Sequence, residues 1–148
     1  MNPYSGILVT AQFVLIALIA SPLDGLRLTS IVSATGWVII VAAMLLAFSA
    51  VVAMRIRNLS VLPEPVRNGE LVERGPYKTI RHPMYSSVLL GCGGLTLIHG
   101  EWINGAWLLL LVVVLLLKIN REESLLAETY PDYRAYIGRS RRLIPGLY

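Results

Sequence analysis

The sequence predicts an all-α integral membrane protein of about four transmembrane helices. Hydrophobic residues make up 55% of the 148 residues and charged residues only 15%, whereas about a quarter of the residues in an average soluble protein are charged. Of the thirteen Lys and Arg residues, only Arg27 lies outside residues 55–81 and 118–142. Long uncharged stretches thus alternate with basic ones, as in a multi-pass membrane protein. The length suits a single domain over residues 1–148.

The first two predicted spans are Ser5–Leu23 and Ile31–Met54, and neither contains a charged residue. About 20 apolar residues are needed to cross the hydrocarbon core of a bilayer, so both stretches are long enough. The sequence around Pro22 and Gly25 ends the first span, because these residue types interrupt a helix. Arg55 marks the point where the second span reaches an interface.

The third and fourth predicted spans are Met84–Ile98 and Trp102–Leu117. The third is short and rich in Ser and Gly, and small residues let helices pack closely in lipid. The fourth is strongly apolar and begins with a tryptophan, a residue that prefers the membrane interface. The chain then turns polar, and we expect helices over residues 118–142 outside the bilayer.

Four spans place both termini on one side of the membrane, together with the basic residues 55–81. The excess of Lys and Arg makes this side cytoplasmic. Two polar clusters, residues 75–85 and 118–123, then lie at the same cytoplasmic interface. We expect a multi-pass protein of a bacterial or archaeal inner membrane, with both termini in the cytoplasm.

The first polar cluster contains the stretch Arg81-His82-Pro83-x-Tyr85. Pro83 disfavours helical backbone at His82 and is well suited to the first turn of the third helix. The unpaired N–H groups of a helix start favour an anion, so His82 and Tyr85 would flank a binding site. The alternative is a membrane-entry motif, in which Arg81 contacts lipid phosphate and Tyr85 the interface.

The second polar cluster holds Glu122 and Glu123, just beyond the last span. Lys118 and Glu122 are four residues apart and can pair on a helix surface. Alternatively the acidic pair binds a positively charged ligand at the depth of His82, because acidic residues near the membrane boundary require a partner. The arginine-rich segment 139–142 is expected to contact lipid headgroups rather than nucleic acid.

A metal site is not expected. The two histidines, His82 and His99, lie at opposite membrane faces in this topology, and the spacing of Cys and His fits no zinc site. The sequence also contains neither a phosphate-binding loop nor the glycine fingerprint of a dinucleotide-binding fold.

The two clusters together resemble the isoprenylcysteine carboxyl methyltransferase family and its phospholipid methyltransferase relatives. The resemblance extends from Gly69 to the C-terminus. It is carried by these residues: Gly75, Tyr77, Arg81, His82, Pro83, Tyr85, Glu122, Glu123, Leu126, Tyr130, Pro131, Tyr133, Tyr136, Ile144 and Pro145. Members of this family are integral-membrane enzymes that use S-adenosylmethionine without a Rossmann domain.

The resemblance implies a cofactor site but does not identify a catalytic residue. The implied cofactor-binding residues are Glu70, Leu71, Val72, Tyr77, His82, Pro83, Met84, Tyr85 and Glu122. Lys118 falls where the prenylcysteine enzymes carry a substrate-contacting arginine, although lysine cannot give the same bidentate grip on a carboxylate. The implied substrate is a lipophilic or lipidated acceptor whose nucleophile is a carboxylate, amine or thiol.

Two other functions are compatible with the sequence. Membrane sterol reductases, which use NADPH, share a related RHxxY stretch and an ending similar to residues 142–148, but they are normally much longer. A non-catalytic membrane protein would use the same motifs only as interface anchors. The brevity of the chain and its pair Glu122 and Glu123 favour the methyltransferase, with lipophilic substrates and membrane lipids as partners.

Overall fold

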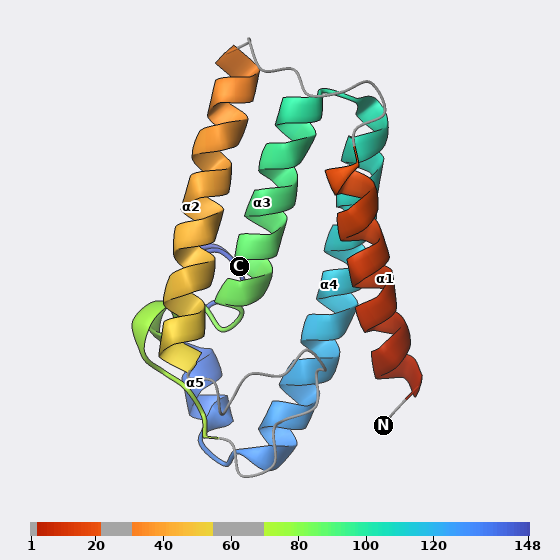
Figure 1. The fold of residues 1–148 in the computed structure, drawn as a ribbon. Coiled ribbons are helices and arrows are strands. Elements are labelled where there is room, and N and C mark those ends of the chain that lie inside the picture. Colours follow the sequence, from red (N-terminus) through yellow and green to blue (C-terminus); the bar gives the residue numbers. More distant parts are fainter. Residues whose placement is uncertain (1–2, 22–30, 55–69) are drawn as a thin grey trace.

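The computed structural model describes residues 3–21, 31–54 and 70–148 (Figure 1). Within these ranges the protein is all-helical, as predicted, and contains no strand. Its elements in chain order are α1 (Pro3–Ala20), α2 (Ile31–Met54), the 3-10 helix η2 (Gly75–Lys78), α3 (Pro83–His99), α4 (Trp102–Thr129) and α5 (Tyr133–Arg139).

The long helices of this described part form a bundle in which neighbours in the chain run in opposite directions (Figure 1). α2 packs along α3, α1 packs along α4, and the contact between α3 and α4 joins the two pairs. The start of α1, the start of α3 and the end of α4 lie at one end of the bundle, with α5 beside them (Figure 1). Both predicted polar clusters therefore lie at the same end.

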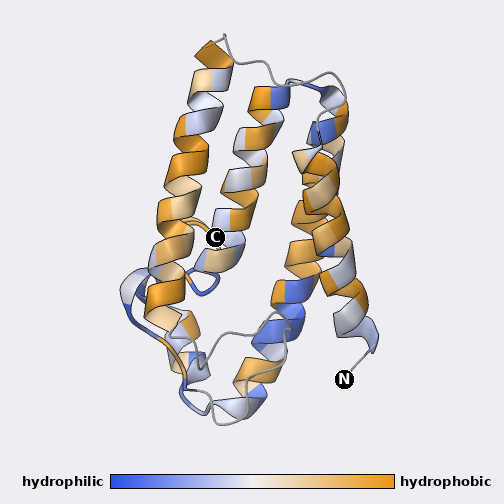
Figure 2. Ribbon diagram, in the orientation of Figure 1, coloured by the Kyte–Doolittle hydropathy of each residue, from blue (hydrophilic) through white to orange (hydrophobic). Residues whose placement is uncertain are grey.

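The helices have the lengths and composition of membrane spans. Three of them, α1, α2 and α4, are long and apolar enough to cross a bilayer. α3 has 17 residues, or roughly 26 Å at about 1.5 Å per residue, which is close to the thickness of the hydrocarbon core. Figure 2 shows apolar residues along the length of the bundle and polar residues at the end of α4. The prediction of four spans is compatible with this arrangement.

The predicted boundaries agree closely with the observed ones. α2 has the predicted limits, and α3 extends the predicted third span by one residue at each end. α1 ends at Ala20. Residues 22–25, which were expected to end this span, lie outside the described residues. Residues 102–117 are the apolar part of α4, which continues without a break to Thr129. The polar helices predicted over 118–142 are the rest of α4 and α5.

Glycine brings α2 and α3 into close contact. A Cβ atom added to Gly36 would lie 2.7 Å from the backbone oxygen of Gly94, and one added to Gly94 would lie 2.7 Å from the backbone oxygen of Gly36. Such small residues let the two backbones approach in a way that larger residues would prevent. The packing role expected for the small residues of α3 therefore applies to Gly94.

Gly94→Ala should destabilise the protein, because its methyl group would collide with the α2 backbone and with Ile40. We expect a loss of about 1–3 kcal/mol, the usual cost of overpacking, measured by thermal or denaturant unfolding in detergent. Gly93→Ala is the matched control, since a Cβ there meets nothing within 4 Å. Equal stability of the two variants would contradict the close packing of α2 on α3.

Candidate functional site

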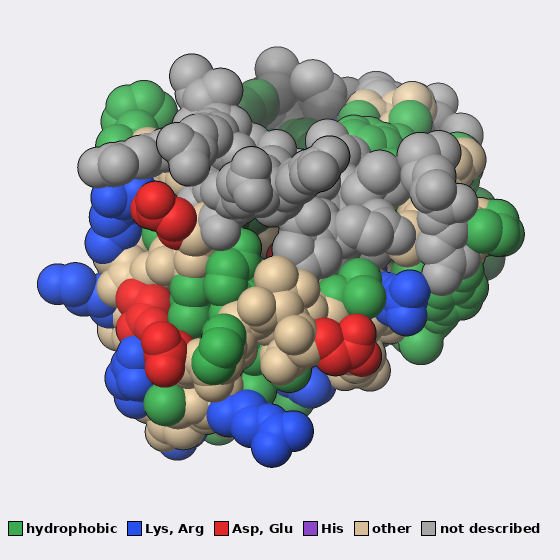
Figure 3. All heavy atoms as spheres, turned by 90° about the horizontal axis from the view of Figure 1, so that it is seen from below, with side chains coloured by type: hydrophobic (Ala, Val, Ile, Leu, Met, Phe, Trp, Pro, Cys, Tyr) green, Lys and Arg blue, Asp and Glu red, His purple; other side chains and the backbone are tan. Residues whose placement is uncertain are grey.

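The candidate site forms where the start of α3, the polar part of α4 and the C-terminal segment meet. Seen from this end of the bundle, charged side chains of both signs gather on the surface (Figure 3). The chain before α3 lies alongside the C-terminal segment: the Arg81 amide donates to the Arg141 carbonyl at 2.6 Å, and the His82 amide donates to the Arg142 carbonyl at 3.0 Å. These bonds fix both segments beside α3.

Glu123 is the most heavily bonded side chain of the site. Its carboxylate accepts hydrogen bonds from Arg81 Nε at 2.7 Å and from Arg142 Nε at 3.0 Å, and His82 Nε2 lies 3.3 Å away. The side chain is only 9% exposed. Charge-assisted bonds of this kind are roughly twice as strong as neutral ones. Glu123 therefore joins α4 to the start of α3 and to the C-terminal segment.

Glu122 differs from its neighbour in both bonding and exposure. Its Oε2 accepts a hydrogen bond from Tyr85 Oη at 2.7 Å, and His82 Nδ1 lies 3.8 Å from the same oxygen. The side chain is 25% exposed, and among the described residues Oε1 accepts no hydrogen bond. Within the described part of the chain, Glu122 thus keeps unused acceptor capacity at a partly exposed position, whereas Glu123 does not.

His82 and Tyr85 are placed by the start of α3, as predicted. His82 precedes the helix with non-helical backbone angles, φ −124° and ψ 57°, and Pro83 occupies the first turn. The rings of His82 and Tyr85 stack with their centroids 5.5 Å apart. The His82 ring also lies against both glutamates. The structure therefore brings His82, Tyr85 and Glu122 together, although they come from both polar clusters.

Tyr77 lies near the charge of Glu122. It is buried in η2, and its carbonyl accepts a hydrogen bond from Tyr136 Oη at 2.6 Å. Burial raises the pKa of Tyr136 to about 12. Burial, and then the nearby Glu122 charge, also raise the pKa of Tyr77 well above its usual range. Both phenols stay protonated at neutral pH. Tyr133 and Tyr136 share one face of α5, as predicted, with ring centroids 5.9 Å apart.

Lys118 does not pair with Glu122, although their spacing would allow it. The Lys118 side chain is buried, and its Nζ donates to Gln12 Oε1 of α1 at 2.7 Å. Nζ also lies 5.1 Å from the centroid of the Tyr85 ring, within cation–π range. Gln12 was not among the predicted site residues. The available signal was an amide side chain within an otherwise apolar span.

The other predicted residues lie beside the cluster rather than in it. Val72 is buried against Ala50, Ala53 and Tyr77, and the partly buried Met84 packs on the same group. Pro83 is buried, Leu71 is half-buried and Glu70 is exposed. Their assignment to cofactor binding stays a prediction.

Two arginines of the segment 139–142 form ion pairs within the protein, while their predicted contact with lipid headgroups stays a prediction. Arg142 pairs with Glu123, and Arg139 pairs with Glu73 in the segment before η2. Each pair joins the C-terminal part of the chain to another element. These arginines therefore help to hold the polar end of the bundle together.

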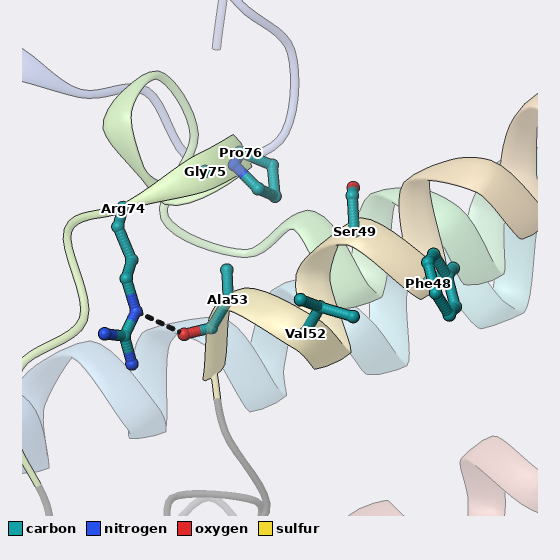
Figure 4. A pocket seen from close by; sticks show the side chains of 7 residues that line it. All are labelled: Phe48, Ser49, Val52, Ala53, Arg74, Gly75 and Pro76. Atoms are coloured by element: carbon teal, nitrogen blue, oxygen red, sulfur yellow. Dashed lines mark hydrogen bonds between the residues drawn. The ribbon is translucent and has the colours of Figure 1, made fainter.

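An open pocket of about 520 Å³ lies between α2 and η2, apart from these residues. Figure 4 shows its lining, which is mostly apolar on the α2 side, with Ser49 as the polar exception, and includes Arg74, Gly75 and Pro76. Arg74 Nε donates to the Ala53 carbonyl at 2.8 Å, which attaches η2 to the end of α2. No predicted site residue lines this pocket, so we place the candidate site at Glu122.

Over residues 31–133, the sequence matches the protein family described as phospholipid methyltransferase. The match covers more than half of the chain and includes α2, α3, α4 and both polar clusters. It excludes α1 and the C-terminal segment. No curated protein matches the chain.

The unequal bonding of the two glutamates predicts unequal effects on stability. Glu123→Gln should lower the free energy of unfolding by about 3 kcal/mol, because it leaves the buried Arg81 without its charged partner. Glu122→Gln is the matched control and should cost much less, since its carboxylate is partly exposed. Unfolding in detergent would measure both. A larger loss in Glu122→Gln would contradict these assignments.

Proposed function

Because the chain belongs to the phospholipid methyltransferase family, we propose that it uses S-adenosylmethionine to methylate a lipophilic or membrane-associated acceptor. The observation that carries this proposal is the Glu122 carboxylate. It lies beside the rings of His82 and Tyr85, is partly exposed, and keeps one oxygen without a hydrogen bond among the described residues.

The chemistry of this cluster suits the cofactor. A carboxylate with unused acceptor capacity accepts hydrogen bonds from an amino group or from the hydroxyl groups of a ribose. Aromatic rings such as that of Tyr85 attract cations through their faces, and the cofactor carries a sulfonium. We assign Glu122, His82 and Tyr85 to its binding, with Tyr77, Pro83, Met84 and the backbone of residues 70–72 nearby. When bound, S-adenosylmethionine supplies an electrophilic methyl group.

The residues of the chain contribute mainly by orientation. Glu123 holds His82, and Glu122 holds the Tyr85 hydroxyl, so the side chains of the site are fixed before any ligand binds. Correct orientation of two reactants can lower a barrier by about 7–11 kcal/mol. A carboxylate acceptor would need no general base, whereas a protonated amine or a thiol must first lose its proton.

The position of the site in the bundle supports a membrane-associated acceptor. The cluster lies where the apolar helices meet the polar end of the protein (Figure 2). A lipophilic acceptor would approach from the bilayer while the soluble cofactor approaches from water. We place this end, with both termini, on the cytoplasmic side, because the basic residues gather in the segments connected to it.

The reductase and the non-catalytic membrane protein remain as competing functions. The reductase rests on the RHxxY stretch and on the ending over residues 142–148. The family match favours the methyltransferase, since it names a transferase and includes both polar clusters. Binding of S-adenosylhomocysteine, of NADPH, or of neither separates the three functions.

We therefore predict that the detergent-purified protein binds S-adenosylhomocysteine but not NADPH in calorimetric titrations. Glu122→Ala should weaken this binding at least about tenfold, because it removes a charged hydrogen-bond acceptor. Glu128→Ala is the matched control, since Glu128 is an exposed residue of the same helix and should leave the affinity unchanged.

Other results would overturn the proposal in distinct ways. NADPH binding alone would move the protein to the reductases. Binding of neither ligand by folded protein would favour the non-catalytic alternative. Unchanged affinity in Glu122→Ala would remove Glu122 from the site while leaving the cofactor in place.

A further inference from the structure

We propose that Gln12 of α1 is a positioning residue of the site. It holds the Lys118 ammonium group away from Glu122, and so keeps the Glu122 carboxylate available to the cofactor. This inference deepens the proposed function and rests on it, because it concerns the role of Glu122 as a cofactor ligand. It also gives α1, which lies outside the matched residues 31–133, a part in the site.

The positions of Lys118 and Glu122 would ordinarily lead to an ion pair. They are four residues apart on α4, and side chains at this spacing are neighbours on a helix surface. The two residues nevertheless form no ion pair in the described structure. Instead, Lys118 Nζ donates to Gln12 Oε1 at 2.7 Å. The Glu122 carboxylate on the same helix thus accepts its hydrogen bond from Tyr85 instead of Lys118.

Burial makes the choice of acceptor important. Lys118 is only 2% exposed and Gln12 only 7%. An ammonium group buried without an acceptor is costly, so Lys118 must find a partner inside the bundle. The candidates are the amide oxygen of Gln12 on α1 and the carboxylate of Glu122 one turn along α4. The structure shows the first.

Tyr85 links the two alternatives. Its hydroxyl donates to Glu122 Oε2 at 2.7 Å, and its ring faces Lys118 Nζ at 5.1 Å. With Lys118 held by Gln12, Glu122 accepts from the Tyr85 hydroxyl and forms no ion pair with the ammonium. A phenol leaves the carboxylate its negative charge, whereas a paired ammonium would cancel it. Only the charged carboxylate attracts a cationic group of the cofactor.

Within the described part of α1, the turns next to Gln12 supply no other buried polar side chain. Gln12 is the only glutamine in the sequence, and the buried residues on the next turns of α1, Leu8 and Leu15, are apolar. Gln12→Leu would leave Lys118 without its acceptor on α1. Lys118 would then turn to Glu122 and offset the negative charge of the carboxylate.

The test is calorimetric titration of S-adenosylhomocysteine into four detergent-purified proteins: wild type, Gln12→Leu, Lys118→Met and the double variant. Gln12→Leu should weaken binding about tenfold, the effect of competition by a charged partner. The double variant should bind S-adenosylhomocysteine more tightly than Gln12→Leu and with the same affinity as Lys118→Met, because no ammonium remains to compete. Such non-additivity identifies coupling between the two residues.

Two further variants keep the test interpretable. Gln12→Glu retains an acceptor for Lys118 and should bind the ligand like wild type, even where Gln12→Leu folds poorly. Thr10→Val removes a polar group from the exposed face of α1 and should change neither affinity nor stability. Thermal unfolding of each unliganded protein separates a loss of folding from a loss of binding.

A purely structural role gives a different pattern. If Gln12 only attaches α1 to α4, Gln12→Leu will unfold at a lower temperature with unchanged affinity, and the inference fails. It also fails if the double variant binds as weakly as Gln12→Leu. In both cases wild-type binding would leave the proposed function intact, whereas absence of binding by folded wild type would overturn the function itself.

Discussion

The carboxylate of Glu123 is the interaction on which the polar end of this protein depends. It accepts bonds from Arg81 and Arg142 and contacts His82, so a single side chain of α4 fixes the start of α3 and the C-terminal segment. Removing one charge from a buried ion pair costs more stability than the intact pair contributes, because the partner charges stay buried. Together with the backbone bonds of Arg81 and His82, this one residue therefore holds the cluster in place.

That constraint explains why adjacent glutamates have different roles. With Glu123 committed to holding the fold, Glu122 is turned toward Tyr85 and remains partly exposed. Lys118 donates a hydrogen bond to Gln12 and lies over the Tyr85 ring. In the site that we propose, Glu123 and Gln12 would thus position other side chains rather than bind the ligand. Such positioning suits a reaction that depends chiefly on orientation.

The sequence was sufficient to predict the long apolar helices and the meeting of the two clusters. A long uncharged stretch such as residues 31–54 has few alternatives to a membrane helix, and the order of the spans then places both clusters at one end. The division between Glu122 and Glu123 was not predictable, because it depends on the rotation of α4 against partners about forty residues away in the chain. Gln12 was missed for the same reason, since its contact with Lys118 spans 106 residues.

Methyl transfer itself tests most directly whether the Glu122 cluster is a membrane methyltransferase site. Membranes containing the protein would be incubated with S-adenosylmethionine carrying a labelled methyl group, and the label extracted into organic solvent would be measured. The account predicts label in the lipophilic fraction with wild type and little above background with Glu122→Ala. Equal label from the two proteins, or none from folded wild type supplied with its native membrane lipids, would contradict the assignment of a membrane methyltransferase site to this cluster.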